Sequence, residues 1–92
     1  MATRKPLASL ERALDVLTLA AAAESGLDLR QIAAALGLTN TTSHNVVQTL
    51  VKKRFLARTG DRRRYRYRLG PAIAELMATS SSRALLAAAE NS

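Results

Sequence analysis

The sequence predicts a mainly α fold with one small two-stranded β hairpin, built as a single domain. The chain has 92 residues, of which 48% are hydrophobic and 23% charged, which is typical of a small globular domain with one core. Apolar residues recur every three or four positions as far as about residue 53, which is the period of a helix. Between residues 55 and 69 the period is two, which is the period of a strand.

The chain divides into three segments. Residues 1–8 are a short basic arm without a periodic pattern, and residues 9–78 contain the helices and strands predicted for the domain. Residues 79–92 are expected to extend the last helix as a linker or to fray as a tail. The core must be thin, because 18 residues are alanine and three are aromatic. We therefore expect self-association to contribute to stability.

A first helix is predicted over residues 9–24. Ser9 is a favourable N-cap for this helix, and Gly26 is the expected C-terminal stop. The apolar residues at helical spacing are Leu10, Ala13, Leu14, Leu17 and Ala21.

The next two predicted helices form a helix-turn-helix. Asp28 and Gln31 have the spacing of a capping box, which opens a second helix that ends at Gly37. Gly37 suits a turn that needs a left-handed backbone, and Ala33 is small enough for the two helices to cross closely. A third helix, preceded by several N-cap residues, is predicted to end near Lys53. Its apolar stripe comprises Ser43, Val46, Val47, Leu50 and Val51.

A β hairpin is predicted after the third helix. Its strands cover Phe55–Thr59 and Tyr65–Leu69, around a turn centred on Gly60-Asp61. Tyr65 and Tyr67 share one face of the second strand, so packing on the core is favoured over stacking on nucleic-acid bases.

A last helix is predicted to start at Pro71, directly after Gly70. Its expected buried side comprises Ile73, Leu76 and Met77. The complete order of elements is that of a winged helix-turn-helix, in which the hairpin is the wing.

The positive charge is concentrated in one stretch. The chain carries 14 basic and 7 acidic residues, a net charge of +7. Residues 52–68 hold nine basic residues and one acidic residue, whereas the rest of the chain has a net charge of −1. Such a stretch repels itself unless an anion lies against it, which favours a polyanionic partner. The stretch lacks the large apolar face of a membrane-bound helix, so no membrane partner is expected.

The exposed face of the third helix carries side chains that hydrogen-bond to base edges or phosphates. An α-helix fits the major groove of B-DNA, where Asn and Gln can bind adenine with two hydrogen bonds. The residues predicted to bind double-stranded DNA from this recognition helix are Asn40, Thr41, Thr42, His44, Asn45, Gln48 and Lys52. The residues predicted to bind the DNA backbone or the minor groove from the wing and the basic stretch are Lys53, Arg58, Arg62, Arg63, Arg64 and Arg66.

Other classes of function are disfavoured. The chain has no Cys and one His, so we expect no disulfide, no metal site and no cofactor. His44 has no nucleophile or acidic partner at a site-like spacing, so an enzyme is not expected. No signal peptide or apolar run long enough to span a membrane is present, which favours the cytoplasm.

Four stretches of the sequence resemble the DNA-binding domain of the IclR (isocitrate lyase regulator) family of transcriptional regulators. They are S-L-E-R-A-L-D-V-L from Ser9, L-R-Q-I-A-A-A-L-G-L from Leu29, T-T-S-H from Thr41 and Y-R-L-G from Tyr67. The resemblance runs from about residue 9 to residue 77. It implies a homodimer, in which the first helix and the helix after the wing contribute to the interface. The corresponding residues here are Leu10, Leu14, Leu17, Ile73, Leu76 and Met77.

The sequence departs from the family pattern in three places. The family usually has Arg at the position of Asn45, so a phosphate or guanine contact is expected to be lost or exchanged for a preference for adenine. The family usually has Gly at the position of Arg54, so a different approach to the first strand is expected. Family members carry an effector-binding domain after the linker helix, whereas this chain ends at Ser92. We therefore expect no ligand-sensing domain and no small-molecule ligand.

The leading hypothesis is a homodimeric, sequence-specific DNA-binding protein that regulates transcription. The alternative is a winged-helix module for RNA, non-specific DNA or protein, because the fold alone does not determine the function. The two hypotheses differ in what Asn45 and Gln48 do. Both side chains matter for the first hypothesis and neither matters for the second.

Overall fold

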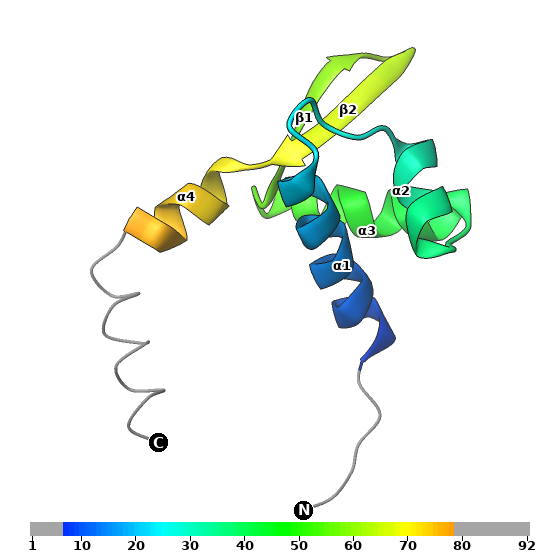
Figure 1. Ribbon diagram of the computed structural model, residues 1–92, viewed down its shortest axis with the longest axis horizontal. Coiled ribbons are helices and arrows are strands. Elements are labelled where there is room, and N and C mark those ends of the chain that lie inside the picture. The colour runs from blue at the N-terminus through cyan, green and yellow to red at the C-terminus, as the bar shows by residue number, and fades with distance from the viewer. Residues whose placement is uncertain (1–6, 79–92) are drawn as a thin grey trace, which may run out of the picture.

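The computed structural model describes residues 7–78, and their fold is the predicted winged helix-turn-helix (Figure 1). The predicted tail over 79–92 lies outside the described residues, as does most of the arm predicted over 1–8. No helix of the described part is long and apolar enough to cross a membrane. The elements in chain order are α1 (Ala8–Ala22), α2 (Leu29–Leu36), α3 (Asn40–Lys52), β1 (Leu56–Asp61), β2 (Arg64–Leu69) and α4 (Pro71–Ala78).

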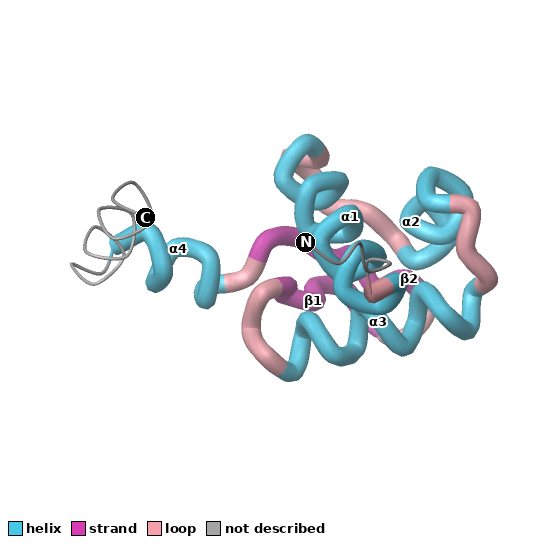
Figure 2. The backbone as a smooth tube through the Cα atoms, turned by 90° about the horizontal axis from the view of Figure 1, so that it is seen from below, coloured by secondary structure: helices cyan, strands magenta, loops and turns pink. Residues whose placement is uncertain are grey.

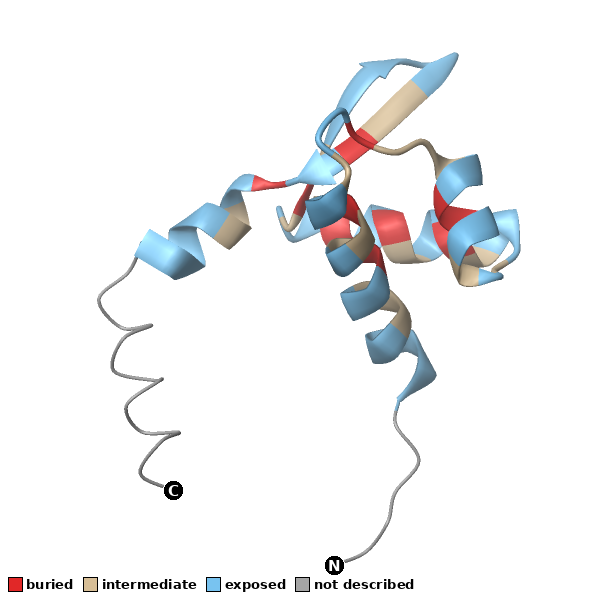
Figure 3. Cartoon of the chain, viewed as in Figure 1, coloured by how far each residue is buried: buried red, intermediate tan, exposed pale blue. Residues whose placement is uncertain are grey.

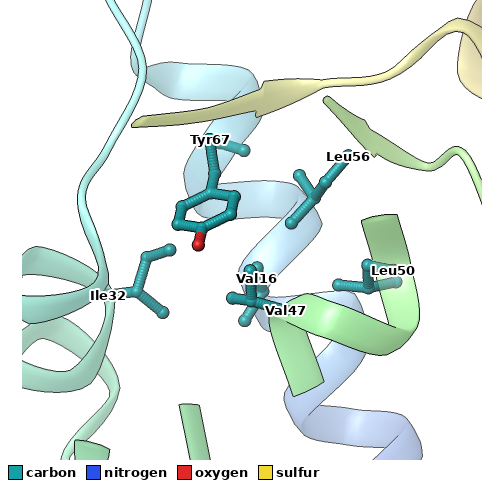
Figure 4. Close-up of a cluster of buried hydrophobic side chains, with 7 residues drawn as sticks. Val16, Ile32, Val47, Leu50, Leu56 and Tyr67 are labelled. Atoms are coloured by element: carbon teal, nitrogen blue, oxygen red, sulfur yellow. The ribbon is translucent and has the colours of Figure 1, made fainter. Parts of the chain in front are cut away.

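One small core holds α1, α2, α3 and the base of the wing together (Figure 4). Val16 of α1, Ile32 of α2 and Val47 of α3 are fully buried, and Leu56 of β1 and Tyr67 of β2 close the cluster from the side of the sheet. Removing these apolar surfaces from water is the main stabilising contribution in a domain of this size. The stripe predicted for α3 therefore packs inward, with Ser43, Val47 and Leu50 buried.

The first helix begins one residue and ends two residues before the predicted bounds of 9–24. The helix begins at Ala8, where Leu7 is the N-cap residue without a side-chain cap, so Ser9 lies inside the first turn. The helix ends at Ala22, and Gly26, the predicted stop, has a φ of 85° in the segment between α1 and α2. The chain leaves the helix early because Leu27 must lie beside β2, where Leu27 and Tyr67 exchange two backbone hydrogen bonds of 3.0 and 2.7 Å.

The helix-turn-helix has the predicted local signals. Asp28 accepts a hydrogen bond of 2.8 Å from the Gln31 backbone N–H, and the Gln31 side chain accepts one of 2.9 Å from the Asp28 N–H. Gly37 ends α2 with a φ of 65°, the left-handed conformation that glycine adopts without strain. Thr39 then caps α3 by accepting a hydrogen bond from the Thr42 N–H. These caps set the angle between α2 and α3.

The wing is an antiparallel pair in which Leu56 lies opposite Leu69 and Asp61 opposite Arg64. The turn therefore falls at residues 62–63, and the prediction of a turn at Gly60-Asp61 is wrong. Gly60 lies within the strand with a φ of 93°, and a Cβ there would collide with the Arg64 carbonyl oxygen. Glycine is needed at this position for the close approach of the two strands and not for the reversal of the chain.

The expected buried side of the last helix is exposed in the single chain. Figures 2 and 3 show α4 projecting from the body formed by the other elements, and α4 has no buried residue. Ile73 is half-buried, whereas Leu76 is 53% and Met77 80% exposed. The helical spacing of these residues correctly predicted that α4 has an apolar face. The prediction that this face is buried is wrong for the described part of the chain.

Candidate nucleic-acid interface

The outer face of α3 is a polar strip. Because Ser43, Val47 and Leu50 point into the core, the polar residues between them face solvent, whereas Val46 is half-buried against the core. Six of the predicted DNA-binding residues on this helix are exposed, namely Asn40, Thr41, His44, Asn45, Gln48 and Lys52.

Thr42 differs from the other predicted residues of the recognition helix. It is half-buried, and its hydroxyl accepts a hydrogen bond of 3.0 Å from the Thr39 hydroxyl. The Thr42 backbone N–H also donates to Thr39, at 3.1 Å. The geometry therefore gives Thr42 a part in the cap of α3.

Two hollows lie between the helices and the wing. One, of about 560 Å³, is lined by Asn45, Gln48 and Lys52 of α3 and by Arg58 of β1, with Tyr67 among the remaining lining residues. The second, of about 450 Å³, extends towards α2. Its lining residues are Asp28, Leu29, Arg30, His44, Arg58, Arg63, Arg64, Tyr65 and Tyr67. Sequence reasoning missed Arg30 as a candidate site residue, because this arginine lies 22 positions before the basic stretch starts.

Arg58 lines both hollows and is held in place by an aromatic ring. Its guanidinium carbon lies 4.3 Å from the centroid of the Tyr65 ring, a cation–π geometry. Burial raises the pKa of the Tyr67 phenol above its usual value, while the Arg58 charge lowers this pKa and Tyr65 raises it. Tyr67 is thus a core residue, as predicted, whereas Tyr65 is half-buried and supports a cation.

The arginines at residues 62–64 are exposed at the tip of the wing. The turn is stabilised by a hydrogen bond of 3.0 Å from the Arg63 backbone N–H to the Asp61 carboxylate. Asp61 is the one acidic residue of the basic stretch, and this bond holds its side chain against the backbone of the turn. Arg63 and Arg64 reach the second hollow, so the tip and α3 border the same space.

Two other basic residues of the predicted site lie apart from these hollows. Lys53 is the C-cap of α3 and lines neither hollow. Arg66 is half-buried on the opposite face of β2, where its guanidinium donates to the carbonyl oxygens of Ser25 (3.5 Å) and Gly26 (3.3 Å). Arg66 thus holds the loop between α1 and α2 against the wing, away from α3.

The residues predicted for dimerisation leave apolar surface exposed on α1 and α4. Leu10 and Leu14 are each 55% exposed. Leu17 is half-buried against the core. Within residues 7–78 no group of three or more His, Cys, Asp or Glu side chains has the arrangement needed to hold a metal ion.

Comparison of the sequence with known protein families identifies one family that it matches. The IclR helix-turn-helix domain matches residues 9–60, which is more than half of the chain. The chain belongs to the IclR helix-turn-helix family. This family consists of transcriptional regulators that bind DNA through the domain, and it is not a class of enzymes. DNA binding is therefore the functional class of this IclR-type domain, which occurs in transcriptional regulators.

Solved structures agree with this assignment. An IclR transcriptional regulator from Alicyclobacillus acidocaldarius is 31% identical, with a TM-score of 0.67 over 78% of this chain. The match covers 28% of that regulator, so this chain spans well under a third of its length. No match to a curated protein was found.

Two more distant regulators share the fold. The PcaV transcriptional regulator from Streptomyces coelicolor, solved with its natural ligand, is 22% identical with a TM-score of 0.54, over 99% of this chain and 76% of its own. The AntR antimony-specific transcriptional repressor is 24% identical with a TM-score of 0.52, over 88% of this chain and 68% of its own. At these identities the likeness concerns the fold alone.

Proposed function

We propose that this IclR-type domain binds a specific double-stranded DNA sequence as a homodimer and thereby regulates transcription. The observation that carries the proposal is the exposed polar strip of α3, which borders the same two hollows as the basic wing. A helix presented in this way fits the major groove, and the wing arginines beside it fit the phosphate backbone or a narrow minor groove.

Asn45 and Gln48 are the proposed base readers. Both are exposed on α3, and both line the hollow that Arg58 and Lys52 also border. An amide side chain can bind adenine with two hydrogen bonds, each such pair discriminating by about 1–3 kcal/mol against other bases. Lys52 and the tip arginines supply phosphate contacts, which strengthen binding to every sequence and fix the register of α3.

The exposed apolar surface of α1 and α4 supports the homodimer. Leu10 and Leu14 of α1 and Met77 of α4 are each more than half exposed, and large apolar side chains exposed on a helix are typical of an interaction surface. A two-fold dimer would present two α3 helices, about one turn of DNA apart, to a pseudo-palindromic site.

Selection of bound sequences from a random duplex pool at about 0.15 M salt tests the proposal. We expect an enriched pseudo-palindrome, bound by a species with twice the mass of the chain. The double variant Asn45→Ala, Gln48→Ala should lose this enrichment and retain binding to random DNA, which serves as the internal control. Binding without enrichment in the unaltered chain would instead favour a module for RNA, bulk DNA or protein.

The dimer is tested separately by mass in solution. Leu14→Asp places a charge in the exposed apolar surface of α1 and should shift the protein to the monomer. Ala34→Asp adds the same charge at an exposed position of α2 and should leave the mass unchanged. If the two variants had equal masses, the assignment of the α1 surface to the interface would be wrong.

A further inference from the structure

The hollow between α2, α3 and the wing carries a charge that the described part of the chain does not neutralise. Four arginines line it, at positions 30, 58, 63 and 64, and one acidic residue, Asp28. The Asp28 carboxylate already accepts the capping hydrogen bond from Gln31. Within residues 7–78 the one ion pair joins Arg54 to Glu75, so none of these four arginines is in a salt bridge. A concave surface with this surplus of cations attracts an anion.

The elements that build the hollow come from distant parts of the chain. Arg30 lies in the first turn of α2 and His44 on α3, whereas Arg58 comes from β1. The half-buried Tyr65 and the buried Tyr67 also line the hollow, whereas its four arginines are exposed. Cations from α2, β1 and the tip of the wing therefore converge on one concave surface, which concentrates their field on a bound anion.

The register of the two strands places the Arg58 side chain over the Tyr65 ring. Gly60 lies directly opposite Tyr65, so no side chain covers the ring from that position. Arg58, two residues before Gly60 and on the same face of the sheet, lies over the ring instead, at 4.3 Å from its centroid. The planar guanidinium can stack on the ring and still direct its N–H groups at a phosphate.

We propose that this hollow binds one phosphodiester of the DNA backbone, with Arg30 and Arg58 as its ligands and Tyr65 as the residue that positions Arg58. The inference rests on the proposed function, because it assigns a second contact to the same DNA. Arg30 extends the DNA interface onto α2, beyond the recognition helix and the wing. A guanidinium binds a phosphate through two parallel hydrogen bonds, which suits a contact that fixes the register of α3.

The salt dependence of binding to duplex DNA tests the two ligands. Arg30→Ala and Arg58→Ala should each weaken binding about tenfold, equally for the selected sequence and for random DNA. Each should also reduce the slope of log K against log salt by about 1 for each bound protomer, since each protomer loses one phosphate contact. Arg68→Ala is the matched control. Arg68 is exposed on the face of β2 opposite Tyr65 and Tyr67, and its replacement removes the same charge. Its slope should equal that of the unaltered protein.

The positioning role of Tyr65 is tested by a double-mutant cycle. Tyr65→Phe retains the ring and should bind DNA like the unaltered protein, whereas Tyr65→Leu should weaken binding about threefold to tenfold. In the Arg58→Ala background Tyr65→Leu should have no further effect, since the cation that the ring supports is gone. Urea unfolding of each variant separates loss of the contact from loss of the fold.

The outcomes distinguish this inference from the proposed function. The proposed phosphate contact is wrong if the salt slope of Arg30→Ala equals that of Arg68→Ala. It is also wrong if the losses of binding free energy caused by Tyr65→Leu and Arg58→Ala are additive. The proposed function then stands, provided that the unaltered protein still enriches one sequence. A protein that does not bind duplex DNA at any salt concentration would overturn both.

Discussion

Arg54 and Glu75 join the start of the wing to α4. The guanidinium meets the carboxylate through two contacts, of which the Nη1–Oε1 contact is 3.3 Å long. The Arg54 carbonyl oxygen also accepts a hydrogen bond of 2.9 Å from the Ala72 N–H. Arg54 has a φ of 70° and is the one non-glycine residue with a positive φ in the described range. A single residue thus combines backbone strain with a tether to α4.

The strain at Arg54 can be measured by comparing two variants. Arg54→Gly and Arg54→Ala both remove the ion pair, but only glycine adopts a left-handed φ without a steric cost. We expect the glycine variant to be more stable than the alanine variant by about 1 kcal/mol, measured by urea unfolding. Equal stabilities would show that this backbone conformation carries no strain.

The ion pair itself should contribute little. Its two side chains are 58% and 55% exposed, and exposed pairs contribute about 0–1 kcal/mol, less at high salt. Glu75→Gln keeps the shape of the side chain and removes the charge. We expect a loss of stability in that range, which should shrink when urea unfolding is repeated at 1 M salt, where the Debye length is about 3 Å.

Replacing Ser43 by Ala should increase the stability of the fold. Its side chain is fully buried, and its hydroxyl has no hydrogen-bond partner among the described residues. A buried hydroxyl without a partner costs about 1–3 kcal/mol. Ser43→Ala removes it with little change in volume, so we expect the free energy of unfolding to rise by roughly 1 kcal/mol. Ser43→Val is the contrasting variant, because its extra methyl groups should overpack the buried space around residue 43 and lower stability.

The helix-turn-helix could be predicted from the sequence because its signals are local. The Asp28–Gln31 capping box and Gly37 act within one helical turn of the elements they end or begin. The turn of the wing could not be predicted in the same way. Gly60 has the residue type of a turn, but the structure needs it for the close approach to Arg64.

The parts of the site that were missed depend on register and on distant contacts. Arg30 lines the second hollow only because α2 packs beside the wing. The contact of the Tyr65 ring with Arg58 depends on the position of Tyr65 opposite Gly60. The sequence pattern predicted that Tyr65 packs on the core with Tyr67, and it does, but the pattern did not show that the Tyr65 ring also contacts the Arg58 guanidinium. The spacing of Leu76 and Met77 likewise identified an apolar face but not what covers it.

Tyr67 should make stability fall at high pH. Burial raises its pKa above the value near 10 of an unfolded chain. Below pH 10 the phenol is neutral in both states, so it contributes no pH dependence. Above that pH the unfolded state ionises first, and the free energy of unfolding should fall by at most about 1.4 kcal/mol per pH unit until the folded-state pKa is reached.

The Tyr67→Phe variant isolates this effect from the titration of other groups. It keeps the ring in the core and removes the ionisable hydroxyl. We expect the difference in stability between the unaltered protein and Tyr67→Phe to be constant below pH 10 and to change above it. A difference that stays constant up to about pH 11, above the usual phenol pKa of about 10, would contradict the burial of the phenol.

The tip of the wing should contribute up to about half of the salt dependence of DNA binding. Six to eight phosphate contacts per bound domain predict a slope of log K against log salt of about −5 to −7. Arg62, Arg63 and Arg64 are all exposed, so replacing all three by Ala should reduce the magnitude of the slope by up to about 3. The urea midpoint should stay unchanged, because none of the three packs in the core. A slope near −1 in the unaltered protein would mean that the basic stretch does not lie on the DNA backbone, whatever sequence α3 selects.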